Sequence, residues 1–410
     1  MSPAIGVDFG TSNTAAAILR DGAARIVPLE AGNETLPTAV FLDYAARRTV
    51  FGSAAVRAMI DGQDGRFMRA LKSILGTPLA REKRQFLNRR LTLLEIVTEF
   101  LGEIRDRAEA ATGAEIRRVV AGRPVRFHSA DPARNTQAEA DLRGCYAAAG
   151  FEEIRFVNEP EAAARAAGPG RDIGLIVDIG GGTSDFTLFE RLDEPMHILA
   201  SHGIRLGGTD FDKALSLEKV MPLLGLGGEL CNEIGPGRHD VPRALFHDLA
   251  SWEKIAFLYG PATLRNTQAM ARLAVEPRRL NRLVRVIENE IGHDVAFAVE
   301  AAKIGANGAA EAGIDLALVE PGLRPVLTGT ELLSALHPSA RAIRTAIDET
   351  LTLAGIGGDA VGRVIFVGGS SLLSVVEAEV RAALPGAAAE RSDVFTAVVR
   401  GLALCTADAG

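Results

Sequence analysis

Aromatic residues and cysteines are both scarce in this chain. Phe, Trp and Tyr make up 5% of the 410 residues, with a single Trp. The three cysteines, Cys145, Cys231 and Cys405, lie far apart and show neither CxxC nor His-pair spacing. An odd number of widely spaced cysteines argues against a disulfide framework. We therefore expect a reduced, intracellular protein without a structural zinc site.

Long apolar runs and an excess of positive charge are also missing. No run of about 18 apolar residues occurs, and the start, MSPAIGVDFG, lacks the basic stretch and apolar core of a signal peptide. The 45 Lys and Arg residues are outnumbered by 52 Asp and Glu, a net charge of −7. This balance gives no general attraction to nucleic acid or an anionic membrane. We expect a cytoplasmic location and neither of these as a partner.

Length and apolar content together predict a globular α/β protein with two domains. The chain is longer than one hydrophobic core usually supports. Its 47% apolar and 24% charged residues are far from a disordered composition. Because no low-complexity linker divides the chain, we expect the two domains to pack against each other.

One phrase occurs twice, 170 residues apart. VDFGTSNTAA at 7–16 and VDIGGGTSDF at 177–186 each start as an apolar strand that ends in aspartate. Each then passes through a turn of glycine and hydroxyl residues and resumes as an apolar stretch. The pattern predicts strand, turn and strand twice over. It indicates two similarly built halves, each opening with a hairpin.

The remaining elements are predicted from periodicity and turn residues. A glycine turn that opens a helix is expected in GIRLGGTDFDKALS. An irregular segment that interrupts the helices of the second half is expected in GGELCNEIGPGRHD. Further strands are expected in IRRVVAGRPV, IRFVN, RVIFV and residues 195–204. Helices are expected at about 91–112, 133–149, 159–168 with Pro160 in its first turn, 244–258, 278–304, 331–354, 372–383 and 393–407.

The two glycine and hydroxyl turns suit a polyphosphate held between two hairpins. Small residues let backbone N–H groups approach phosphate oxygens, and Thr and Ser hydroxyls add donors. Asp8 and Asp178 can hold Mg²⁺ through its waters. Either turn alone could be an ordinary tight hairpin, but the matched pair favours phosphate. VIFVGGSS adds a third glycine site where a strand meets a helix, although such turns are common in structural roles.

The motifs occur in a specific order along nearly the whole chain, from Ala4 to about Ala407. The motifs are GVDFGTSNT, LKSILG, FVNEPEAAARAAG, VDIGGGTSDFTLFE, LGGTDFD and VIFVGGSSLL. Taken together, they resemble the nucleotide-binding ATPase domain of the Hsp70 chaperones, within the actin-like ATPase superfamily. The resemblance implies a duplicated actin-like, ribonuclease H-like α/β fold. Two lobes would each hold a mixed sheet flanked by helices, with a nucleotide cleft between them. The implied domains are lobe I at 1–168, lobe II at 169–392 and a helix at 393–410 that packs back near lobe I.

The same resemblance implies a site for ATP or ADP with Mg²⁺. Asp8 and Asp178 match the magnesium-coordinating and water-orienting carboxylates. Lys72 matches the catalytic lysine beside the γ-phosphate, and Glu159 matches the carboxylate that places the attacking water. Without this context, Lys72 would be interpreted as a solvated helix lysine and Glu159 as a capping residue. The implied catalytic set is completed by Thr183, and the implied nucleotide-binding residues are Gly10, Thr11, Ser12, Asn13, Gly180, Gly181, Gly182, Asp185, Gly207, Gly208, Asp210, Lys254, Gly368, Gly369 and Ser370.

The adenosine pocket departs from the family pattern. The family has an arginine that packs on the base after GGS, whereas this chain has Leu372 there. Adenine would then meet an aliphatic surface, or bind with weaker affinity and selectivity. The ribose-binding helix best matches SWEKIAFLY, which gives Lys254. We expect Trp252 in this stretch to pack inside its subdomain and not on the base.

Two further departures concern communication and partners. In GRPVRF, Pro124 matches the family's relay proline, but Arg123 and Arg126 replace apolar or aromatic neighbours. The chain stops where the ATPase domain would end, so we expect no peptide-binding domain. In this it resembles the truncated, Hsp70-like bacterial chaperones of the YegD type.

The resemblance implies a slow Mg²⁺-dependent ATPase that acts as a nucleotide-controlled interaction switch for protein clients or co-chaperones. Two alternatives stay open. A small-molecule kinase of the same superfold would need an aspartate base, for which we find no convincing phrase. A filament-forming actin-like protein would need polymerisation surfaces that a sequence does not reveal.

Overall fold

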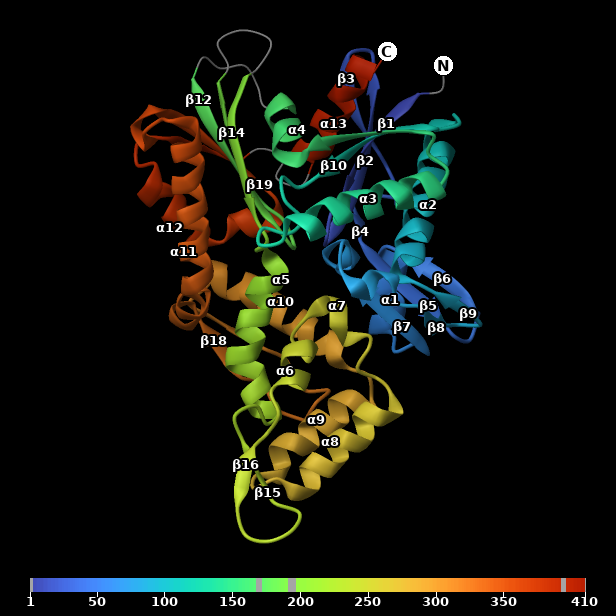
Figure 1. Ribbon diagram of the computed structural model, residues 1–410, viewed down its shortest axis with the longest axis vertical. Coiled ribbons are helices and arrows are strands. Elements are labelled where there is room, and N and C mark those ends of the chain that lie inside the picture. Colours follow the sequence, from blue (N-terminus) through green and yellow to red (C-terminus); the bar gives the residue numbers. More distant parts are fainter. Residues whose placement is uncertain (1–2, 167–171, 191–196, 392–395, 410) are drawn as a thin grey trace. The chain divides into compact units, whose positions relative to one another are not determined.

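The structure is a computed structural model that describes residues 3–166, 172–190, 197–391 and 396–409 (Figure 1). The chain divides into two compact units. The first comprises Met1–Gly208 with Ala340–Gly410, and the second comprises Thr209–Ser339. The predicted boundaries at 168/169 and 392/393 lie outside the described residues.

The first unit contains two five-strand arrays of the same design. In the first, strand order is β11-β10-β1-β2-β3, with the short β4 also paired to β2. β1 is antiparallel to β2 and parallel to β10, and β10 is parallel to β11. The strands are β1 (Ala4–Phe9), β2 (Asn13–Arg20), β3 (Ala23–Val27), β4 (Leu36–Pro37), β10 (Arg118–Arg123) and β11 (Glu153–Asn158).

The second array repeats this order and these directions. It runs β14-β13-β12-β19-β20, with β12 antiparallel to β13 and parallel to β19. The predicted duplication, with a hairpin opening each half, is therefore confirmed. Its strands are β12 (Ile173–Ile179), β13 (Ser184–Glu190), β14 (His197–Ile204), β19 (Val361–Val367) and β20 (Ala388–Glu390).

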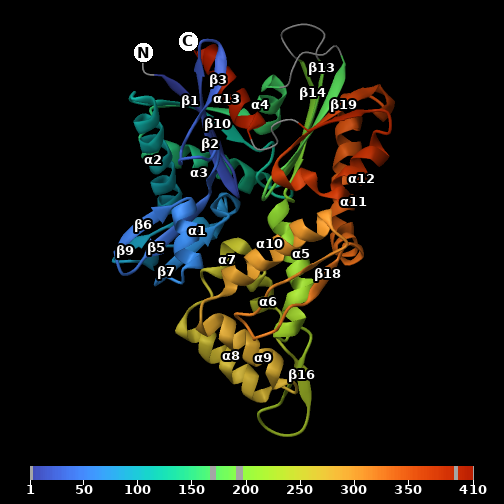
Figure 2. The ribbon, with the colours of Figure 1, turned by 180° about the vertical axis from the view of Figure 1, so that it is seen from behind.

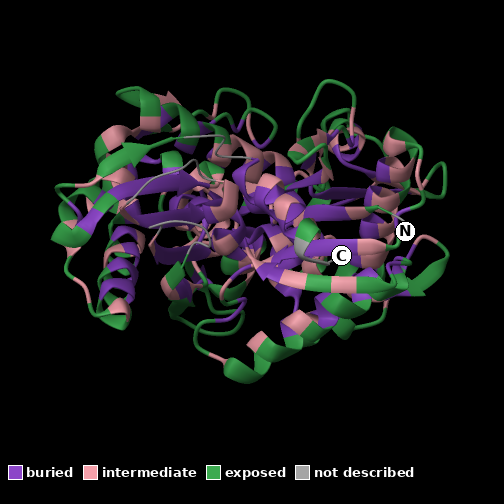
Figure 3. Cartoon of the chain, turned by 90° about the horizontal axis from the view of Figure 1, so that it is seen from above, coloured by how far each residue is buried: buried purple, intermediate pink, exposed green. Residues whose placement is uncertain are grey.

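Two short helices, α4 (Glu159–Ala166) and α13 (Ala397–Leu404), join the two sheets through a shared core (Figure 1). Val120 of the first sheet and Ile176 of the second belong to the same buried cluster as Leu402 of α13. A Cβ on Gly401 would lie only 1.7 Å from the carbonyl oxygen of Ala162 in α4. The glycine therefore lets the two helix backbones touch. Figure 3 shows the strands of these sheets as mainly buried.

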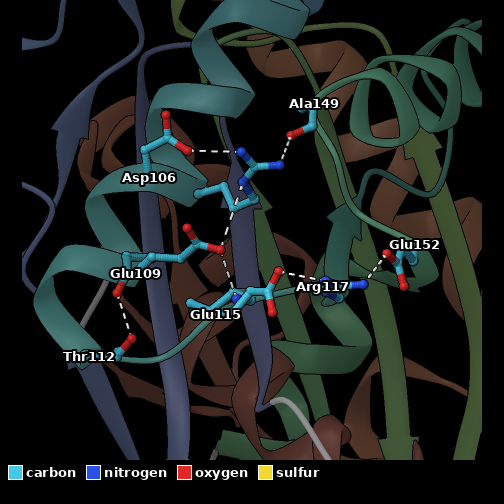
Figure 4. A network of polar contacts seen from close by, with 10 residues as sticks. Asp106, Glu109, Thr112, Glu115, Arg117, Ala149 and Glu152 are labelled. Carbon is cyan, nitrogen blue, oxygen red and sulfur yellow. Dashed lines mark hydrogen bonds and ion pairs between the residues drawn. The ribbon is translucent and has the colours of Figure 1, made fainter.

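The longer helices α2 (Leu93–Thr112) and α3 (Pro132–Ala148) belong to the first lobe. α2 begins with a capping box, in which Thr92 and Glu95 bond each other's backbone N–H groups. Beyond its carboxyl end, Arg117 lies between Glu115 and Glu152 and pairs with both at 2.7 Å (Figure 4). These contacts align β10 with the start of β11.

A small subdomain inserted after β4 carries the LKSILG motif. The three-stranded sheet β6-β5-β7 packs against α1, and the β8–β9 hairpin follows. The motif forms the 3₁₀ helix Leu71–Ile74. The elements are β5 (Ala39–Asp43), β6 (Arg48–Phe51), α1 (Ser53–Ile60), β7 (Gly65–Arg69), a 3₁₀ helix (Pro78–Arg81), β8 (Arg84–Phe86) and β9 (Arg89–Leu91).

Helical segments precede and follow β19 of the second sheet along the chain. The 3₁₀ helix Gly369–Leu372 follows β19 directly, and α12 (Ser374–Ala383) comes next. The strand-to-helix turn predicted for VIFVGGSS is therefore confirmed. The long α11 (Gly329–Ala354) precedes β19, with the 3₁₀ helix Gly358–Ala360 between them.

The second unit is mainly helical. Trp252 is buried here, as predicted, with its Nε1 donating to Asp212 at 3.0 Å and its ring edge-on to Phe297. The elements are α5 (Gly208–Leu215), a π-helix (Ser216–Val220), a 3₁₀ helix (Met221–Leu224), β15 (Glu229–Cys231), β16 (Arg238–Asp240), α6 (Ala244–Leu249), α7 (Trp252–Ile255), α8 (Pro261–Leu273), α9 (Pro277–Glu288), α10 (Gly292–Gly308), β17 (Glu311–Gly313) and β18 (Val326–Thr328).

Three predictions for this unit were wrong in detail. The helix expected at 278–304 is interrupted after α9, where Glu290 takes a left-handed conformation. The helix expected at 244–258 is broken by the extended Ser251 between α6 and α7. The segment expected to be irregular forms the β15–β16 hairpin, because Gly235 and Gly237 adopt the positive φ that its turn requires.

The other predicted elements agree with the structure apart from their ends. The parts of the predictions that cover 167–168, 195–196 and 393–395 lie outside the described residues. Cys145, Cys231 and Cys405, all within the described residues, form no disulfide with one another. Across the ranges that the structure describes, no helix combines the length and apolar character needed to cross a bilayer.

Candidate functional site

The two repeated turns lie against each other within the first unit. A Cβ on Gly181 would lie 2.6 Å from Ser12 Oγ and 3.0 Å from Thr11 Cβ, and one on Gly182 would lie 3.1 Å from Thr11 Oγ1. A Cβ at either position would force the side chains of Thr11 or Ser12 to shift, so glycine favours this close approach. The turns from the two halves therefore form one continuous, backbone-rich surface.

Two further glycine segments, at 207–208 and 368–370, join this surface. A Cβ on Gly207 would lie 2.6 Å from the backbone of Gly181, and one on Gly208 would lie 2.5 Å from Ser370 Oγ. A Cβ on Gly368, whose φ is 76°, would lie 2.9 Å from Asp178 Oδ1. The tertiary structure thus brings four separate predicted segments to one place.

Hydrogen bonds within the turns hold their shape. Gly180 N–H donates to the carbonyl of Thr183 at 3.0 Å, and Gly208 N–H donates to that of Gly180 at 3.0 Å. In the first turn, the carbonyl of Ser12 accepts from Thr38 N–H at 2.9 Å. Gly10 and Asn13 close that turn, since a Cβ on Gly10 would meet the Asn13 carbonyl oxygen at 2.2 Å.

Lys72 and Glu159 form a buried ion pair at this site. Lys72 Nζ lies 2.6 Å from Glu159 Oε1, and the two residues are 7% and 8% exposed. Burial alone would lower the pKa of Lys72, but Glu159 and Asp8 outweigh it and the pKa is raised. Lys72 is therefore a protonated, buried cation, which excludes the interpretation as a solvated helix lysine.

Carboxylates outnumber cations around this pair. Burial, with the negative charge of Glu159, raises the pKa of Asp8 to about 7 although Lys72 opposes the shift. Burial, together with repulsion from Glu159 and other carboxylates, also raises the pKa of Asp178 well above its ordinary value. Burial and Glu159 do the same to the pKa of Asp185. The site is built for a further positive charge, which would favour the ionised form of these groups.

A divalent cation fits this donor chemistry. Asp8 and Asp178 occupy the next-to-last positions of equivalent strands in the two sheets. Burial and the charges of Glu159, Asp185 and Asp8 together raise the pKa of Asp178. Within the described ranges, no three His, Cys, Asp or Glu side chains form a metal-ligating group. A magnesium ion would therefore take most of its ligands from water and phosphate oxygens, as Mg²⁺ commonly does.

The loop after β10 connects both halves of the site. Val125 N–H donates to Asp185 Oδ1 at 2.9 Å, and His128 Nε2 lies 2.7 Å from the carbonyl of Leu75, three residues after Lys72. Ser129 Oγ accepts from Arg205 N–H at 3.1 Å. One short loop therefore contacts the second turn, the Lys72 segment and the end of β14.

Arginine stabilises the start of this loop. Arg123 bonds the carbonyls of Pro124 and Val125 at 3.0 and 2.9 Å and pairs with Glu139 at 2.6 Å. Arg126, in contrast, is exposed. Arg123, which replaces an apolar or aromatic residue of the family pattern, thus fixes the backbone around Pro124. Arg126 lies at the surface.

Asp141 of α3 is a buried residue near the Lys72 segment that the motifs did not identify. It accepts from Gly76 N–H at 2.9 Å and from Gln137 at 3.0 Å, and it also pairs with Arg81. It therefore anchors the chain just after the 3₁₀ helix that carries Lys72. No local pattern could reveal this role, because Gly76 and Arg81 lie 65 and 60 residues away in the sequence.

The remaining predicted residues lie on the 3₁₀ helix after β19, on α5 and on α7. Gly369 starts the 3₁₀ helix after β19, and Leu372 at its end is 42% exposed. Asp210 and Lys254 belong to the second unit. Asp210 lies in the first turn of α5, and Lys254 pairs with Asp248 at 2.7 Å.

The duplicated sheets and the glycine turns agree with a comparison to known families. The family model described as Hsp70 protein matches residues 4–220, more than half of the chain. The chain belongs to the Hsp70 family. Hsp70 proteins are ATP-binding, chaperone-type ATPases with the duplicated actin-like fold, so the family implies that this chain binds ATP or ADP. The matched region contains both phosphate turns, Lys72 and Glu159.

Proposed function

We propose that this Hsp70-family chain is a slow, Mg²⁺-dependent ATPase that works as a nucleotide-controlled interaction switch. The observation that carries the proposal is the buried Lys72–Glu159 pair, at 2.6 Å, beside the two packed glycine turns. A buried cation among excess carboxylates matches the charge requirements of a magnesium triphosphate. Placement in the YegD-type group stays a prediction.

The proposed reaction is in-line attack of water on the γ-phosphate. The turn amides of Thr11, Ser12, Gly181 and Gly182 would bind phosphate oxygens, and Lys72 would balance the charge that develops there. Glu159 would orient the attacking water and keep Lys72 protonated between turnovers. Asp8 and Asp178 would hold Mg²⁺, which when bound supplies charge compensation.

Slow turnover follows from the charge arrangement. Glu159 is already engaged by Lys72, so no strong free base activates the water. The loop at 124–129 contacts the second turn and the Lys72 segment, which gives nucleotide state a route to the surface at Arg126. These features suit a switch better than a metabolic catalyst. The predicted adenosine contacts remain Gly368, Gly369, Ser370 and Lys254, and Leu372 predicts weaker base selectivity. Asp210 remains a predicted residue of the loop that closes over the site.

The first prediction tests the site directly. Lys72→Ala and Asp178→Asn should each lower single-turnover ATP hydrolysis by about 100-fold, because each removes charge stabilisation from the transition state. Phosphate release is the measurement, with binding of a labelled ATP analogue measured in parallel. Arg265→Gln, on the exposed face of α8, serves as the control.

Three outcomes would contradict the proposal. Unchanged hydrolysis in both variants would show that the site assignment is wrong. Hydrolysis that begins only when sugars or other hydroxyl compounds are added would indicate a kinase. ATP-dependent light scattering would indicate a filament protein.

A further inference from the structure

A cavity lies at the far end of the hairpin that opens the first half of the chain. Its volume is about 450 Å³, which is within the usual range of small-molecule pockets. Its walls come from the end of β2, from β3 and from the last turn of α2. Ile18, which lines the cavity, is five residues beyond Asn13 of the first phosphate turn, roughly 16 Å along a strand. The cavity is therefore separate from the proposed ATPase site.

A two-residue turn fixes which side chains of the hairpin line this cavity. Asp21 and Gly22 both have positive φ, 53° and 75°, as a type I′ turn requires. The turn sets Ile18 of β2 opposite Arg25 of β3, and Arg20 is two residues after Ile18. Paired residues share a face of a sheet, and every second residue of a strand returns to that face. The two arginines and Ile18 therefore lie on one face of the hairpin.

The opposite face of the hairpin is covered by α13. Ala17 belongs to a buried cluster with Val399 and Ala403 of α13, and its strand partner Ile26 packs against the same cluster. Since neighbouring residues of a strand point to opposite sides, the face with the two arginines turns away from α13. It turns toward α2, because Ala111 in the last turn of that helix lines the same cavity.

Contacts from α2 hold the walls of the cavity together. Arg107 of α2 donates to the carbonyl of Leu29, two residues after β3, at 3.1 Å. The same side chain pairs with Glu103 of its own helix at 2.7 Å. Figures 1 and 2 both show the carboxyl end of α2 and the β2–β3 hairpin at the end of the first sheet where β1 begins. The cavity is therefore built from elements that are fixed to one another.

The lining combines an apolar floor with two unpaired cations. Ile18 and the buried Val27 supply apolar surface. Arg20 and Arg25 are exposed, and among the described residues neither guanidinium group has a hydrogen-bond or ion-pair partner. Asp21 is the one carboxylate among the lining residues, so positive charge exceeds negative charge. Guanidinium groups without partners are well suited to bind a carboxylate in bidentate fashion.

This lining favours a small molecule over a metal ion or a polyanion. A single carboxylate, that of Asp21, is a poor donor set for a metal ion. A nucleic acid would find no aromatic ring for base stacking among the lining residues, and the net charge of −7 on the chain would repel it. An apolar body with one acidic group, in contrast, uses both the apolar floor and the cations.

We propose that this cavity binds a small molecule that joins an apolar body to one carboxylate. The carboxylate lies between Arg20 and Arg25, and the apolar body packs on Ile18 and Val27. The site does not depend on ATP hydrolysis, so it can be tested while Mg²⁺ and ADP occupy the nucleotide site. Failure of the ATPase proposal would therefore leave this inference testable.

The dye anilinonaphthalene sulfonate is the probe, because it combines an apolar body with one negative charge. With excess Mg²⁺ and ADP, its fluorescence should rise and saturate at one dye per chain. Naphthoate should displace the dye. Naphthamide has the same shape but no charge, so it should compete about tenfold less well.

Matched variants test where the dye binds. Arg20→Gln combined with Arg25→Gln should weaken binding of the dye by about tenfold, as expected for loss of two charge contacts. Arg265→Gln combined with Arg272→Gln removes two exposed arginines from α8 and should leave the affinity within about twofold. All of these variants should retain the thermal midpoint and ATPase rate of the parent chain.

A second pair of variants tests the apolar part of the cavity. Ala111→Phe adds a ring where α2 lines the cavity and should block the dye. Ala269→Phe adds the same ring on the exposed face of α8 and should leave binding unchanged.

Several results would overturn this inference. They are equal competition by naphthamide and naphthoate, equal weakening by both arginine double variants, no saturable binding of the dye, or displacement of the dye by ADP. Displacement by a glutamate-rich peptide that is tighter than that by naphthoate, and depends on Arg20 and Arg25, would reassign the cavity to a protein partner.

Discussion

His128 lies in the loop that connects two parts of the candidate site. Its Nε2 lies 2.7 Å from the Leu75 carbonyl, while Val125 in the same loop bonds Asp185. Burial lowers the pKa of His128, so the ring is neutral at pH 7 and donates from Nε2–H to the carbonyl. The side chain therefore holds the segment that carries Lys72, and under the proposed function it would act as a positioning residue.

Replacing His128 should separate positioning from binding. His128→Ala should lower kcat by about five- to tenfold with a smaller change in the KM for ATP, because the phosphate turns keep their own hydrogen bonds. His128→Gln, whose amide N–H can reach the same carbonyl, should restore most of the rate. Steady-state phosphate release is the measurement, and equal loss in both variants would argue against a positioning role.

Helix α13 joins the two sheets through close backbone contact with α4. Gly401 lies where a Cβ would reach 1.7 Å from the Ala162 carbonyl oxygen. On the other side, a Cβ on Gly6 of β1 would lie 2.6 Å from Ala403 N. Small residues on three elements thus allow a helix near the end of the sequence to pack onto the strand at its beginning.

An added methyl group at this contact should destabilise the fold. Gly401→Ala should lower the free energy of unfolding by about 1–3 kcal/mol, since overpacking forces backbone shifts. Gly144→Ala in the exposed part of α3, where a Cβ would meet nothing within 4 Å, is the control and should raise stability by about 0.5–1 kcal/mol. Urea unfolding measures both, and equal effects would contradict the packing argument.

The stability of the whole molecule should depend on pH, because some of its carboxyl groups lie beside cations in the folded chain. Two acidic residues of the second unit are held by cations. Hydrogen bonds from Arg282 and Arg278 lower the pKa of Glu320 to about 2, and those from Lys219 and Thr328 lower the pKa of Glu331 to about 2. The ordinary value for both is 4.5.

Depressed carboxyl pKa values predict loss of stability in acid. Below pH 4.5 the unfolded chain binds these protons more readily than the folded chain, so their contribution is complete above that pH and disappears as the pH falls to about 2. The difference in unfolding free energy between the parent chain and Glu320→Gln/Glu331→Gln should therefore shrink over this window. Urea titrations at several pH values measure it, and a constant difference would contradict the assignment.

The local motifs were the most predictable part of the chain. Alternating apolar residues and glycine turns specify β1–β2 and β12–β13 because hairpin formation depends on neighbouring residues. The capping box at Thr92 likewise specifies where α2 begins. The break at Glu290 was missed because the helical periodicity continues across it. The β15–β16 hairpin was missed because its strands have only three residues each.

The sequence by itself determined the duplicated hairpins, the glycine turns and the family, since each depends on residue types at short spacing. Only the tertiary structure decided that Lys72 is a buried cation paired with Glu159, 87 residues away. It alone brought Asp141 and His128 to the Lys72 segment, and Thr49 of β6 and Arg89 of β9 to Glu99. Burial and charge environment arise from contacts between distant segments, and no local pattern encodes them.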